Sequence, residues 1–357
     1  MLVDMFVLQS PVWLCDKYIT VLFTFVDFHS YRIQHLPCPP LSKMSAMDDG
    51  LQHRPSPAPN VRCREIVAAD FDELILVLLK GFPEWTREHC VRALERMTGH
   101  SVPEGFPKYG YVLVADGVIV GVVLTIISSM TVDGEKRVRI NVANWYVDPA
   151  VRGYAAMLTS PLRAYKKATH LNVSPAPHTW VMLEALGYRR FCNGGFFALA
   201  ALSGRAIAAT VKRVSSDFDA GAGLTPSEAE LLRAHAGLGC ISLVCEWEAR
   251  RYPFVFLPTQ IRWKGIPVPY AQLIYCRDFE SYVQLAGPLG RYLMRRGIPL
   301  VLSDANGPVP GLMGRYVNWG VKFSRGPHPP HLGDLSYTER VMFAPELMGI
   351  PQKNSGR

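Results

Sequence analysis

The sequence has few charged residues, no closely paired cysteines and no long hydrophobic run. Only 19% of its 357 residues are charged and 49% are hydrophobic, a balance typical of a globular chain and not of a disordered one. The eight cysteines include no C-x-x-C pair, which excludes the common zinc motifs and favours reduced, buried thiols. We therefore predict a cytoplasmic protein that holds no metal.

The first 60 residues also lack the features of a membrane span or a secretory signal. Their apolar run at residues 18–28 is interrupted by Asp27 and falls short of the ~20 residues that a span needs. It has no basic region before it and no Ala-x-Ala site after it. Prolines at residues 37–40 and 55–59 then suggest a linker. We predict that residues 1–60 are a poorly structured extension, with Met44 or Met47 as the native start; the alternative is a weak membrane or docking segment.

The net charge of +8 would suit a polyanionic partner. Coenzyme A, with its three phosphates, satisfies this as well as nucleic acid does, and so does an ordinary basic surface. The basic pairs Arg250-Arg251 and Arg295-Arg296 have little aromatic sequence between them, which gives no clear indication of a nucleic-acid partner.

A strand and the turn after it form the most informative stretch. Residues 137–147 alternate and are rich in β-branched side chains, which predicts a strand. Asp148-Pro149 ends it, and a tight turn at residues 150–154 leads to a predicted helix over residues 155–167. Because the first N–H groups of a helix lack intrahelical partners, this junction is a candidate anion site.

The run Val147-Asp-Pro-Ala-Val-Arg152-Gly153 resembles the acyl-CoA loop, V-x-P-x-x-[R/Q]-G-x-G-x-[G/A], of the GNAT (Gcn5-related N-acetyltransferase) family. A second run at the expected distance, Met182-Leu-Glu-Ala-Leu-Gly-Tyr188, is similar to the L-Y-E-K-x-G-F segment of that family. The resemblance implies an α+β fold with a mixed, mostly antiparallel sheet flanked by helices.

Residues 61–203 have the order of elements that this family implies. Asp70 is the expected N-cap of the first helix, and Asp116-Gly117 predicts a hairpin turn. The expected elements are a strand at 61–67, helices at 71–79 and 86–97, strands at 111–115, 118–127 and 137–147, the helix at 155–167, a strand at 169–173, a helix at 180–186 and a strand at 188–199.

Residues 204–345 repeat this plan. Thr225, Pro226 and Glu228 predict a helix start. The other expected elements are strands at 239–249, 252–258 and 269–275 with a turn at Lys264-Gly265, a helix at 281–296, a strand at 298–302, a short helix near Met313 and a strand at 320–324. Three blocks align in the same order: residues 160–165 with 287–292, 170–174 with 299–303, and 187–191 with 320–323. We predict two tandem GNAT-like domains, with a kink at Pro161 and Pro288 shared by both copies and a flexible tail at residues 346–357.

The resemblance also implies the site. The backbone of Tyr146 and Val147 would bind the pantetheine arm of acetyl-CoA or another acyl-CoA. The pyrophosphate would be held by the backbone of the loop, with residues Arg152, Gly153, Tyr154, Ala155, Ala156 and Met157. Ala155 and Met157 stand where the resembled family has small residues, and their side chains leave less space for the pyrophosphate to approach the loop backbone.

The usual acid and base of the family are replaced. Asn141 and Asn144 occupy the strand that carries a Glu in many members, and Leu183 falls on the family's Tyr. His178 is the nearest titratable substitute and is our candidate catalytic residue, the alternative being a surface or capping histidine.

These features predict an acyl-CoA-dependent N-acyltransferase that acts on a small-molecule or peptide amine. One alternative is a non-catalytic GNAT-like protein that senses CoA or binds a partner, and a second is a tandem aminoacyl or peptidyl transferase. In the repeat, Asp278-Phe279-Glu280 replaces Val151-Arg152-Gly153, and two carboxylates would repel a phosphate. We therefore expect the second domain to have lost CoA binding and to shape the acceptor site or brace the first domain.

Overall fold

The structure is a computed structural model that describes residues 60–343, apart from positions 133, 204–206, 216–217, 219–221 and 264–265. All of these residues belong to one compact unit, Pro59–Arg357. The predictions for residues 1–59, including the start at Met44 or Met47, lie outside the described residues. So do those for Lys264-Gly265 and the tail at 346–357.

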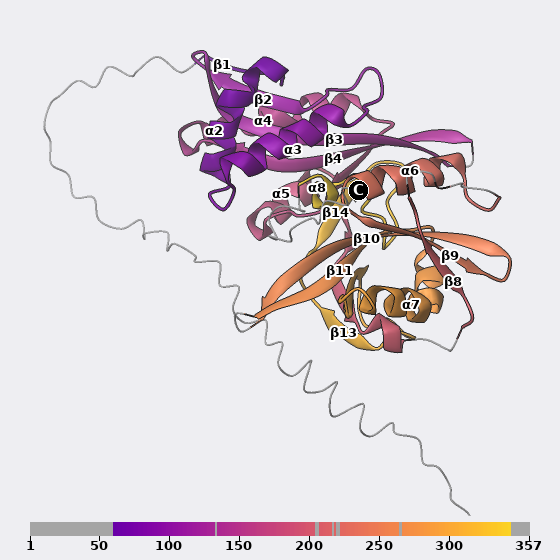
Figure 1. Cartoon of the computed structure of the whole chain (residues 1–357). Helices are drawn as coiled ribbons and strands as arrows, with labels where there is room; N and C mark the ends of the chain where they lie inside the picture. The colour runs from indigo at the N-terminus through magenta and orange to yellow at the C-terminus, as the bar shows by residue number, and fades with distance from the viewer. Residues whose placement is uncertain are drawn as a thin grey trace, which may run out of the picture. The chain divides into compact units, whose positions relative to one another are not determined.

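The first sheet has seven strands in the order β1-β2-β3-β4-β5-β14-β6 (Figure 1). Neighbours run antiparallel except β4 and β5, which are parallel. The hairpin between β2 and β3 turns at Asp116 and Gly117, whose φ angles of 50° and 89° confirm the predicted Asp-Gly turn. The strands are β1 Val61–Glu65, β2 Gly110–Ala115, β3 Val118–Val132, β4 Glu135–Val147, β5 Thr169–Asn172, β6 Arg189–Cys192 and β14 Lys322–Arg325.

The second sheet also has seven strands, in the order β13-β7-β12-β11-β10-β9-β8. Here β11 and β12 form the parallel pair. The structure thus confirms the expected α+β class, two mixed and mostly antiparallel sheets flanked by helices. The strands are β7 Gly194–Ala198, β8 Thr210–Arg213, β9 Ile241–Trp247, β10 Arg250–Trp263, β11 Ile266–Cys276, β12 Leu300–Ala305 and β13 Gly314–Val317.

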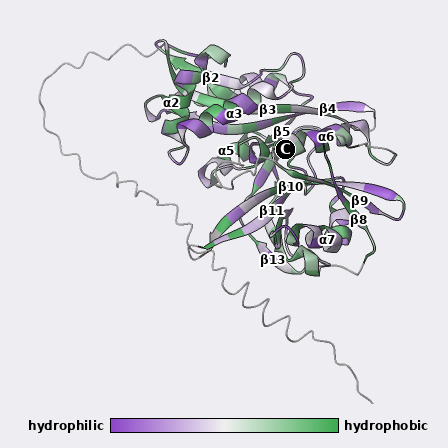
Figure 2. Cartoon of the chain, viewed as in Figure 1, coloured by the Kyte–Doolittle hydropathy of each residue, from purple (hydrophilic) through white to green (hydrophobic). Residues whose placement is uncertain are grey.

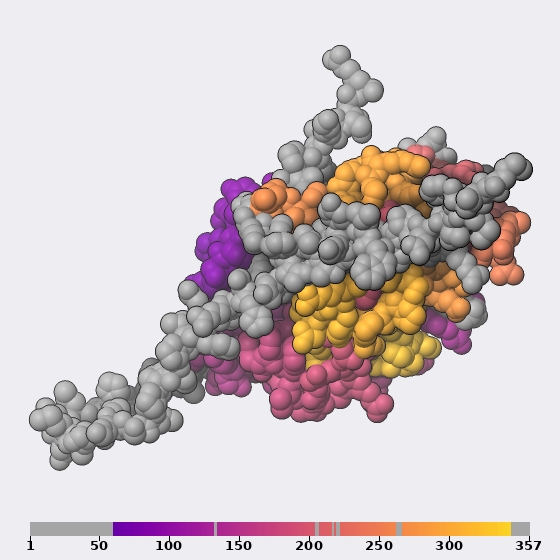
Figure 3. All heavy atoms as spheres, turned by 90° about the horizontal axis from the view of Figure 1, so that it is seen from below, coloured from indigo at the N-terminus to yellow at the C-terminus, as the bar shows by residue number. Residues whose placement is uncertain are grey.

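The two sheets exchange their last strands. β6 lies at the edge of the first sheet, but β7, which follows it after Asn193, lies inside the second sheet between β12 and β13. β14 crosses the other way and lies between β5 and β6. Figure 3 shows yellow-orange residues from the C-terminal part of the chain next to rose-coloured residues from its middle. Counted from β1 in the first sheet and from β8 in the second, the two sheets have the same strand order. In this order β6 corresponds to β13, and β14 in the first sheet corresponds to β7 in the second.

This exchange changes two expectations. The predicted single strand at residues 188–199 is two strands in different sheets. The alignment of residues 187–191 with 320–323 pairs β6 with β14 and is wrong, since the strand order pairs β6 with β13. The predicted division into residues 61–203 and 204–345 stays a prediction, and neither sheet follows it.

Helices cover both faces of each sheet. α2 and α3 pack on one face of the first sheet through a core that includes Leu78 and Leu94, and α2 is largely green in Figure 2. Three short segments, η2, α4 and η3, cover the opposite face. α7 covers one face of the second sheet, and α6 lies in the core on its other face. The bounds are α2 Phe71–Gly81, α3 Arg87–Gly99, η2 Pro149–Tyr154, α4 Ala156–Thr159, η3 Pro161–Ala164, α5 Trp180–Ala185, α6 Pro226–Gly237, α7 Phe279–Met294 and α8 Glu339–Met342, with short 3-10 turns η1 Ala68–Asp70, η4 Pro177–Thr179 and η5 Ala200–Leu202.

Several helix predictions need correction. The helix at residues 155–167 is wrong: the four-residue α4 is flanked by 3-10 turns, and Pro161, which has no N–H to donate, begins η3. α7 runs as one helix of 16 residues through Pro288, so the shared kink stays a prediction at that position. Residues near Met313 form no helix and lead into β13.

The predicted helix caps have mixed outcomes. Asp70 makes no side-chain cap to α2; its carboxylate accepts from the Val67 N–H and pairs with Arg64 at 2.7 Å. The capping box of Thr225 and Glu228 at the start of α6 is confirmed. Within the described ranges, no helix is both long and apolar enough to cross a membrane.

Candidate functional site

A fork between β4 and β5 is the main irregularity of the first sheet. The two parallel strands pair only from Arg139 to Asn141, opposite residues 169–171, and β4 then continues for six more residues to Val147. Asn144, in this continuation, has a φ angle of 46°, and the register with β3 shifts at the same place. Such a bulge bends a strand and redirects its side chains. The bend separates β4 from the end of β5.

A hollow lies beside this fork, and its empty space of about 370 Å³ includes open solvent. Val142 and Trp145 of β4 form one side, and Asn172 of β5 lies on the other. Its remaining lining comes from the segment after β4, from α5 and its following loop, and from β14: Thr159, Leu162, Arg163, Leu183, Leu186, Tyr188 and Arg325. The lining is mostly apolar with two arginines, which suits an extended arm that ends in an anionic group.

The segment beside the hollow is positively charged. Between Asp148 and Glu184 the chain contains no acidic residue, but it carries Arg152, Arg163, Lys166 and Lys167. All four basic side chains are exposed. Clustered cations without carboxylates attract polyanions and strengthen their binding at low salt.

The predicted phosphate loop is a run of 3-10 turns rather than the start of a long helix. Arg152, Gly153, Tyr154 and Ala156 are exposed, as a loop that contacts phosphate must be. The Ala155 N–H already donates to Arg152 O at 3.1 Å, so this amide is engaged within the turn. The site residues of the loop stay a prediction, with Ala155 the weakest of them.

Two residues of the loop, Met157 and Gly153, have clear positions. Met157 is partly buried and packs against the core of this face. At Gly153, an added Cβ would meet nothing within 4 Å, so the surface beside it is open.

Tyr146 and Val147 end β4 on the far side of the bulge. The Tyr146 ring lies against α2, where a Cβ added to Gly81 would come within 2.5 Å of the ring. Neither side chain lines the hollow. Their predicted role in binding the pantetheine arm belongs to the backbone and is not tested by these side-chain positions.

A carboxylate that the sequence did not reveal reaches the fork from the C-terminal end of the described chain. Glu339, the first residue of α8, accepts hydrogen bonds from Asn141 Nδ2 on β4 and from Ser174 Oγ, 2.7 Å away, just after β5. Its two oxygens thus bridge the strands of the fork, although Glu339, like His178, is not among the residues that line the hollow. Asn141 is 198 residues away along the chain, and no local pattern could have predicted this contact.

The predicted catalytic histidine is not part of this arrangement. His178 is exposed on η4 and is not among the residues that line the hollow, so its role stays a prediction. Leu183, which replaces the family's Tyr, is buried and lines the hollow, where it supplies no hydroxyl. Tyr188 lines the same hollow, and burial raises its pKa to about 12 although Arg325 opposes this shift. Its hydroxyl therefore remains protonated and able to donate a hydrogen bond at neutral pH.

Ion pairs and hydrogen bonds hold the segment that carries Glu339. Asp334 pairs with Arg139 of β4 at 2.5 Å and bridges to Tyr275 of β11. Burial alone would raise the pKa of Asp334, but Arg139 lowers it to about 2, so this carboxylate is ionised near neutral pH.

A buried histidine holds the same segment from the side of α6. Burial lowers the pKa of His235 to about 4, so the neutral ring accepts from the Tyr337 N–H and donates to Leu231 O. The contact with Tyr337, two residues before α8, holds the start of this helix against α6.

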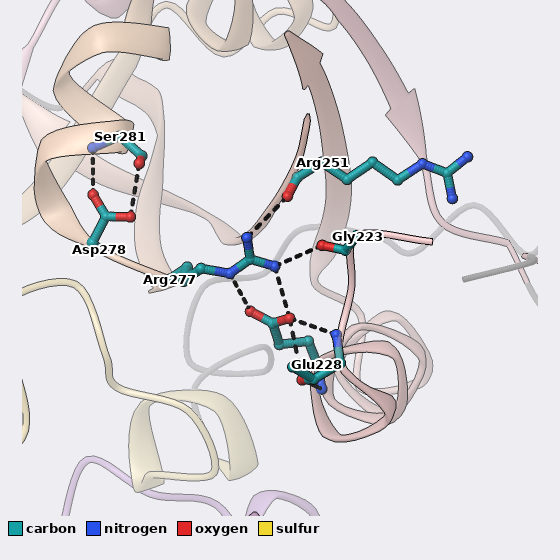
Figure 4. A network of polar contacts seen from close by, with 7 residues as sticks. Gly223, Glu228, Arg251, Arg277, Asp278 and Ser281 are labelled. Carbon is teal, nitrogen blue, oxygen red and sulfur yellow. Dashed lines mark hydrogen bonds and ion pairs between the residues drawn. The ribbon is translucent and has the colours of Figure 1, made fainter. Parts of the chain in front are cut away.

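The corresponding junction of the second sheet is occupied by the protein's own charged groups (Figure 4). Arg277, directly after β11, donates to both carboxylate oxygens of Glu228, at 2.7 and 2.8 Å, and to the carbonyl oxygens of Gly223 and Arg251. Asp278 caps α7 by accepting from the Ser281 N–H at 2.7 Å. A phosphate here would compete with two carboxylates that already satisfy the donors.

Comparison with solved structures finds similar folds among acetyltransferases. A GCN5-related N-acetyltransferase from Anabaena variabilis is 12% identical, with 74% of this chain and 72% of that chain covered and a TM-score of 0.49. Eis1 from Mycobacterium abscessus is 12% identical, with coverages of 74% and 73% and a TM-score of 0.45. A conserved protein of unknown function from Enterococcus faecalis is 13% identical, with coverages of 77% and 73% and a TM-score of 0.49.

These likenesses agree with the resemblance found in the sequence. Because the identities are low and each of these TM-scores is below 0.5, they add no argument about the activity. No protein-family model matches the chain, and no curated protein matches its sequence.

Proposed function

We propose that the chain is an acyl-CoA-dependent N-acyltransferase that binds the acyl-CoA at the fork between β4 and β5. The observation that carries the proposal is the open hollow beside the fork, next to a segment that has four exposed cations and no acidic residue between Asp148 and Glu184. The hollow would take the pantetheine arm, and Arg152, Arg163 and the two lysines would face the phosphates. Acetyl-CoA is the first co-substrate to test.

In this proposal Glu339 takes the role of base. The acceptor amine attacks the thioester carbonyl carbon, a C–N bond forms, and the C–S bond breaks to release CoA thiolate. The amine proton passes to the Glu339 carboxylate, which Asn141 and Ser174 hold at the fork. The Tyr188 hydroxyl is a hydrogen-bond donor for the departing sulfur. The rest of the rate enhancement comes from holding the amine and the thioester close together in the reactive orientation.

A thermal-shift assay with acetyl-CoA, and with adenosine monophosphate as the comparison ligand, tests the binding site. Acetyl-CoA at about 100 times its Kd should stabilise the protein by about 2.7 kcal/mol. Arg152→Glu should abolish the shift, whereas Arg189→Glu, the same change at an exposed position of β6, should preserve it. If Arg152→Glu left the shift unchanged, the phosphates would not bind at this loop.

Release of free thiol from acetyl-CoA in the presence of an amine panel tests catalysis. Glu339→Gln should lower kcat by ~10²–10⁴-fold and leave the acetyl-CoA shift unchanged. His178→Gln is the matched comparison, because it tests the candidate that the sequence suggested. A full acetyl-CoA shift with no thiol release from any amine would favour the non-catalytic alternative, CoA sensing.

A further inference from the structure

The turn before α8 has a strained backbone. Tyr337 has a φ angle of 52°, in the left-handed region that a large side chain rarely adopts. Such a conformation persists only where the surrounding contacts hold it, and it is found most often at functional sites. Tyr337 precedes Glu339 by two residues, so its backbone sets the direction in which α8 leaves the turn. The contacts of Tyr337 therefore influence where the Glu339 carboxylate lies.

Two histidines contact the Tyr337 ring, one from a helix on each sheet. His235, in the last turn of α6, has its ring centre 4.6 Å from that of Tyr337, and the two ring planes make an angle of 62°. His100, directly after α3, has its ring centre 5.3 Å from the same ring. Since α3 packs on the first sheet and α6 on the second, the contacts of Tyr337 join elements from both sheets.

Hydrogen bonds hold the His235 ring and, through it, the backbone of the turn. The Nδ1 of His235 donates to Leu231 O at 2.8 Å, which leaves Nε2 as the acceptor of the Tyr337 N–H at 3.3 Å. Only the neutral ring can make both bonds, because a protonated imidazole has no acceptor. Burial lowers the pKa of His235 to about 4, with a smaller contribution from His100 and with Asp334 opposing it, so the ring is neutral near pH 7.

His100 is held in a similar way on the first sheet. Its Nε2 donates to Ile127 O of β3 at 2.7 Å. Burial lowers its pKa as well, although the bond to Ile127 opposes this shift. Both histidines therefore contact Tyr337 as neutral rings near pH 7, without the cost of a buried charge.

The turn is also tied to the second sheet through its backbone. The Leu335 N–H donates to Ile274 O of β11 at 2.7 Å, and Thr338 Oγ1 donates to Leu335 O at the same distance. Glu339, one residue later, instead reaches Asn141 and Ser174 at the fork. The carboxylate at the fork is thus carried by a turn that the second sheet holds.

We propose that His100 and His235 are positioning residues for Glu339, because they hold the left-handed turn at Tyr337 that directs α8 to the fork. The inference rests on the proposed role of Glu339 as the base. It gives the second sheet a part in the reaction at the first, since α6 and β11 hold the turn from which α8 starts. Neither histidine lines the hollow, so neither is expected to contact the acyl-CoA.

Two substitutions at His235 separate its two hydrogen bonds. The amide of glutamine reaches the position of Nε2, so His235→Gln still accepts from the Tyr337 N–H. The amide of asparagine reaches only the position of Nδ1, so His235→Asn keeps the bond to Leu231 O and loses the acceptor. The two variants are matched in charge and polarity and differ in the contact that the proposal requires.

Hydrogen exchange of the full chain, measured by mass spectrometry, tests the turn without any substrate. The amides of Val341, Met342 and Phe343 donate to Thr338 O or Glu339 O and report on α8. Their exchange should be about tenfold faster or more in His235→Asn and close to that of the unmodified protein in His235→Gln.

Steady-state kinetics with acetyl-CoA tests the link to Glu339. His235→Asn should lower kcat by about tenfold or more, because a misplacement of ~1 Å can cost ~10²-fold, and should leave KM for acetyl-CoA unchanged. His235→Gln should retain kcat to within about threefold. In a Glu339→Gln background, His235→Asn should cause no further loss of kcat, because a positioning residue acts only through the group that it positions.

The proposal is overturned if His235→Asn leaves the exchange of α8 unchanged, whether or not the chain turns over an amine. It is also overturned if His235→Gln is as slow as His235→Asn, or if the losses of kcat add in the double variant. Full kcat in Glu339→Gln alone would contradict the proposed base, and the exchange result would still decide whether the histidines hold the turn. If His235→Asn does not fold, the partly exposed His100 is changed instead: His100→Gln keeps a donor for Ile127 O, removes the ring from Tyr337 and should show the same two effects.

Discussion

The two strand-to-helix junctions of this molecule occupy the same place in sheets of the same strand order, yet they are built in opposite ways. After β4 the chain makes a broken series of short turns, which Asp148 caps by accepting from the Ala150 N–H, and four exposed cations follow before the next acidic residue, Glu184. After β11 it enters the 16-residue α7, whose start is capped by Asp278 and braced by the Arg277–Glu228 pair. The first junction thus leaves its cations exposed, whereas the second pairs its arginine with a carboxylate of the same chain.

The close packing of α7 on η5 gives the largest expected effect on stability at the second junction. A Cβ added to Gly290 would lie 2.1 Å from the Ala201 backbone nitrogen in η5, a distance that forces the backbones apart. Gly290→Ala should therefore lower the free energy of unfolding, measured in guanidinium chloride, by about 3 kcal/mol.

Gly99→Ala is the matched control, because an added Cβ at this position of α3 would meet nothing within 4 Å. It should stabilise the protein by about 0.5 kcal/mol through the better helix propensity of alanine. Equal effects of the two substitutions would show that α7 does not pack on η5 at close range.

The Arg277–Glu228 pair gives the next largest effect. Glu228 has a side chain only 6% exposed, so Arg277→Gln leaves its carboxylate buried with Thr225 as its remaining partner. We expect a loss of about 2 kcal/mol, less than for a fully buried pair because Arg277 is 38% exposed. Urea unfolding of the variant measures this loss.

Lys212→Gln serves as the control, because it breaks an exposed pair with Glu246 that has a similar separation of 2.7 Å. It should cost about 0.5 kcal/mol or less. An Arg277→Gln variant as stable as the Lys212→Gln variant would mean that the second junction does not depend on its internal counter-ions.

Local features of this fold could be predicted from the sequence because they depend on neighbouring residues. The Asp116-Gly117 turn and the Thr225–Glu228 capping box require contacts across three residues or fewer. The exchange of β7 and β14 could not be predicted, since β14 pairs with strands more than 120 residues earlier and any exposed strand edge offers the same hydrogen bonds.

The candidate site likewise combines features that could be predicted from the sequence with features that depend on tertiary contacts. The loop around Arg152 was visible as a motif, but the hollow near it depends on the bulge at Asn144 and on side chains from five separate parts of the chain. Glu339 was missed because its only link to the fork is tertiary. Its proposed role as the base depends on the position of α8, and Asp334 and His235 hold the segment just before this helix.

The two prolines test the comparison with the smallest expected effects. Pro288 lies inside α7, where it removes a hydrogen bond, and Pro161 begins the 3-10 turn η3, where its N–H would not be needed. Pro288→Ala should therefore raise the free energy of unfolding by about 1 kcal/mol, part of the full helix preference for alanine being offset by lost packing of a buried ring. Pro161→Ala should instead lower the free energy of unfolding by about 0.5 kcal/mol, because the unfolded chain gains freedom and the turn gains no bond. Both values come from denaturant titration, and circular dichroism reports any added helix. If Pro161→Ala were as stabilising as Pro288→Ala and increased the helical signal, Pro161 alone would prevent a longer helix after β4. The series of short turns would then not be a general property of this part of the first sheet.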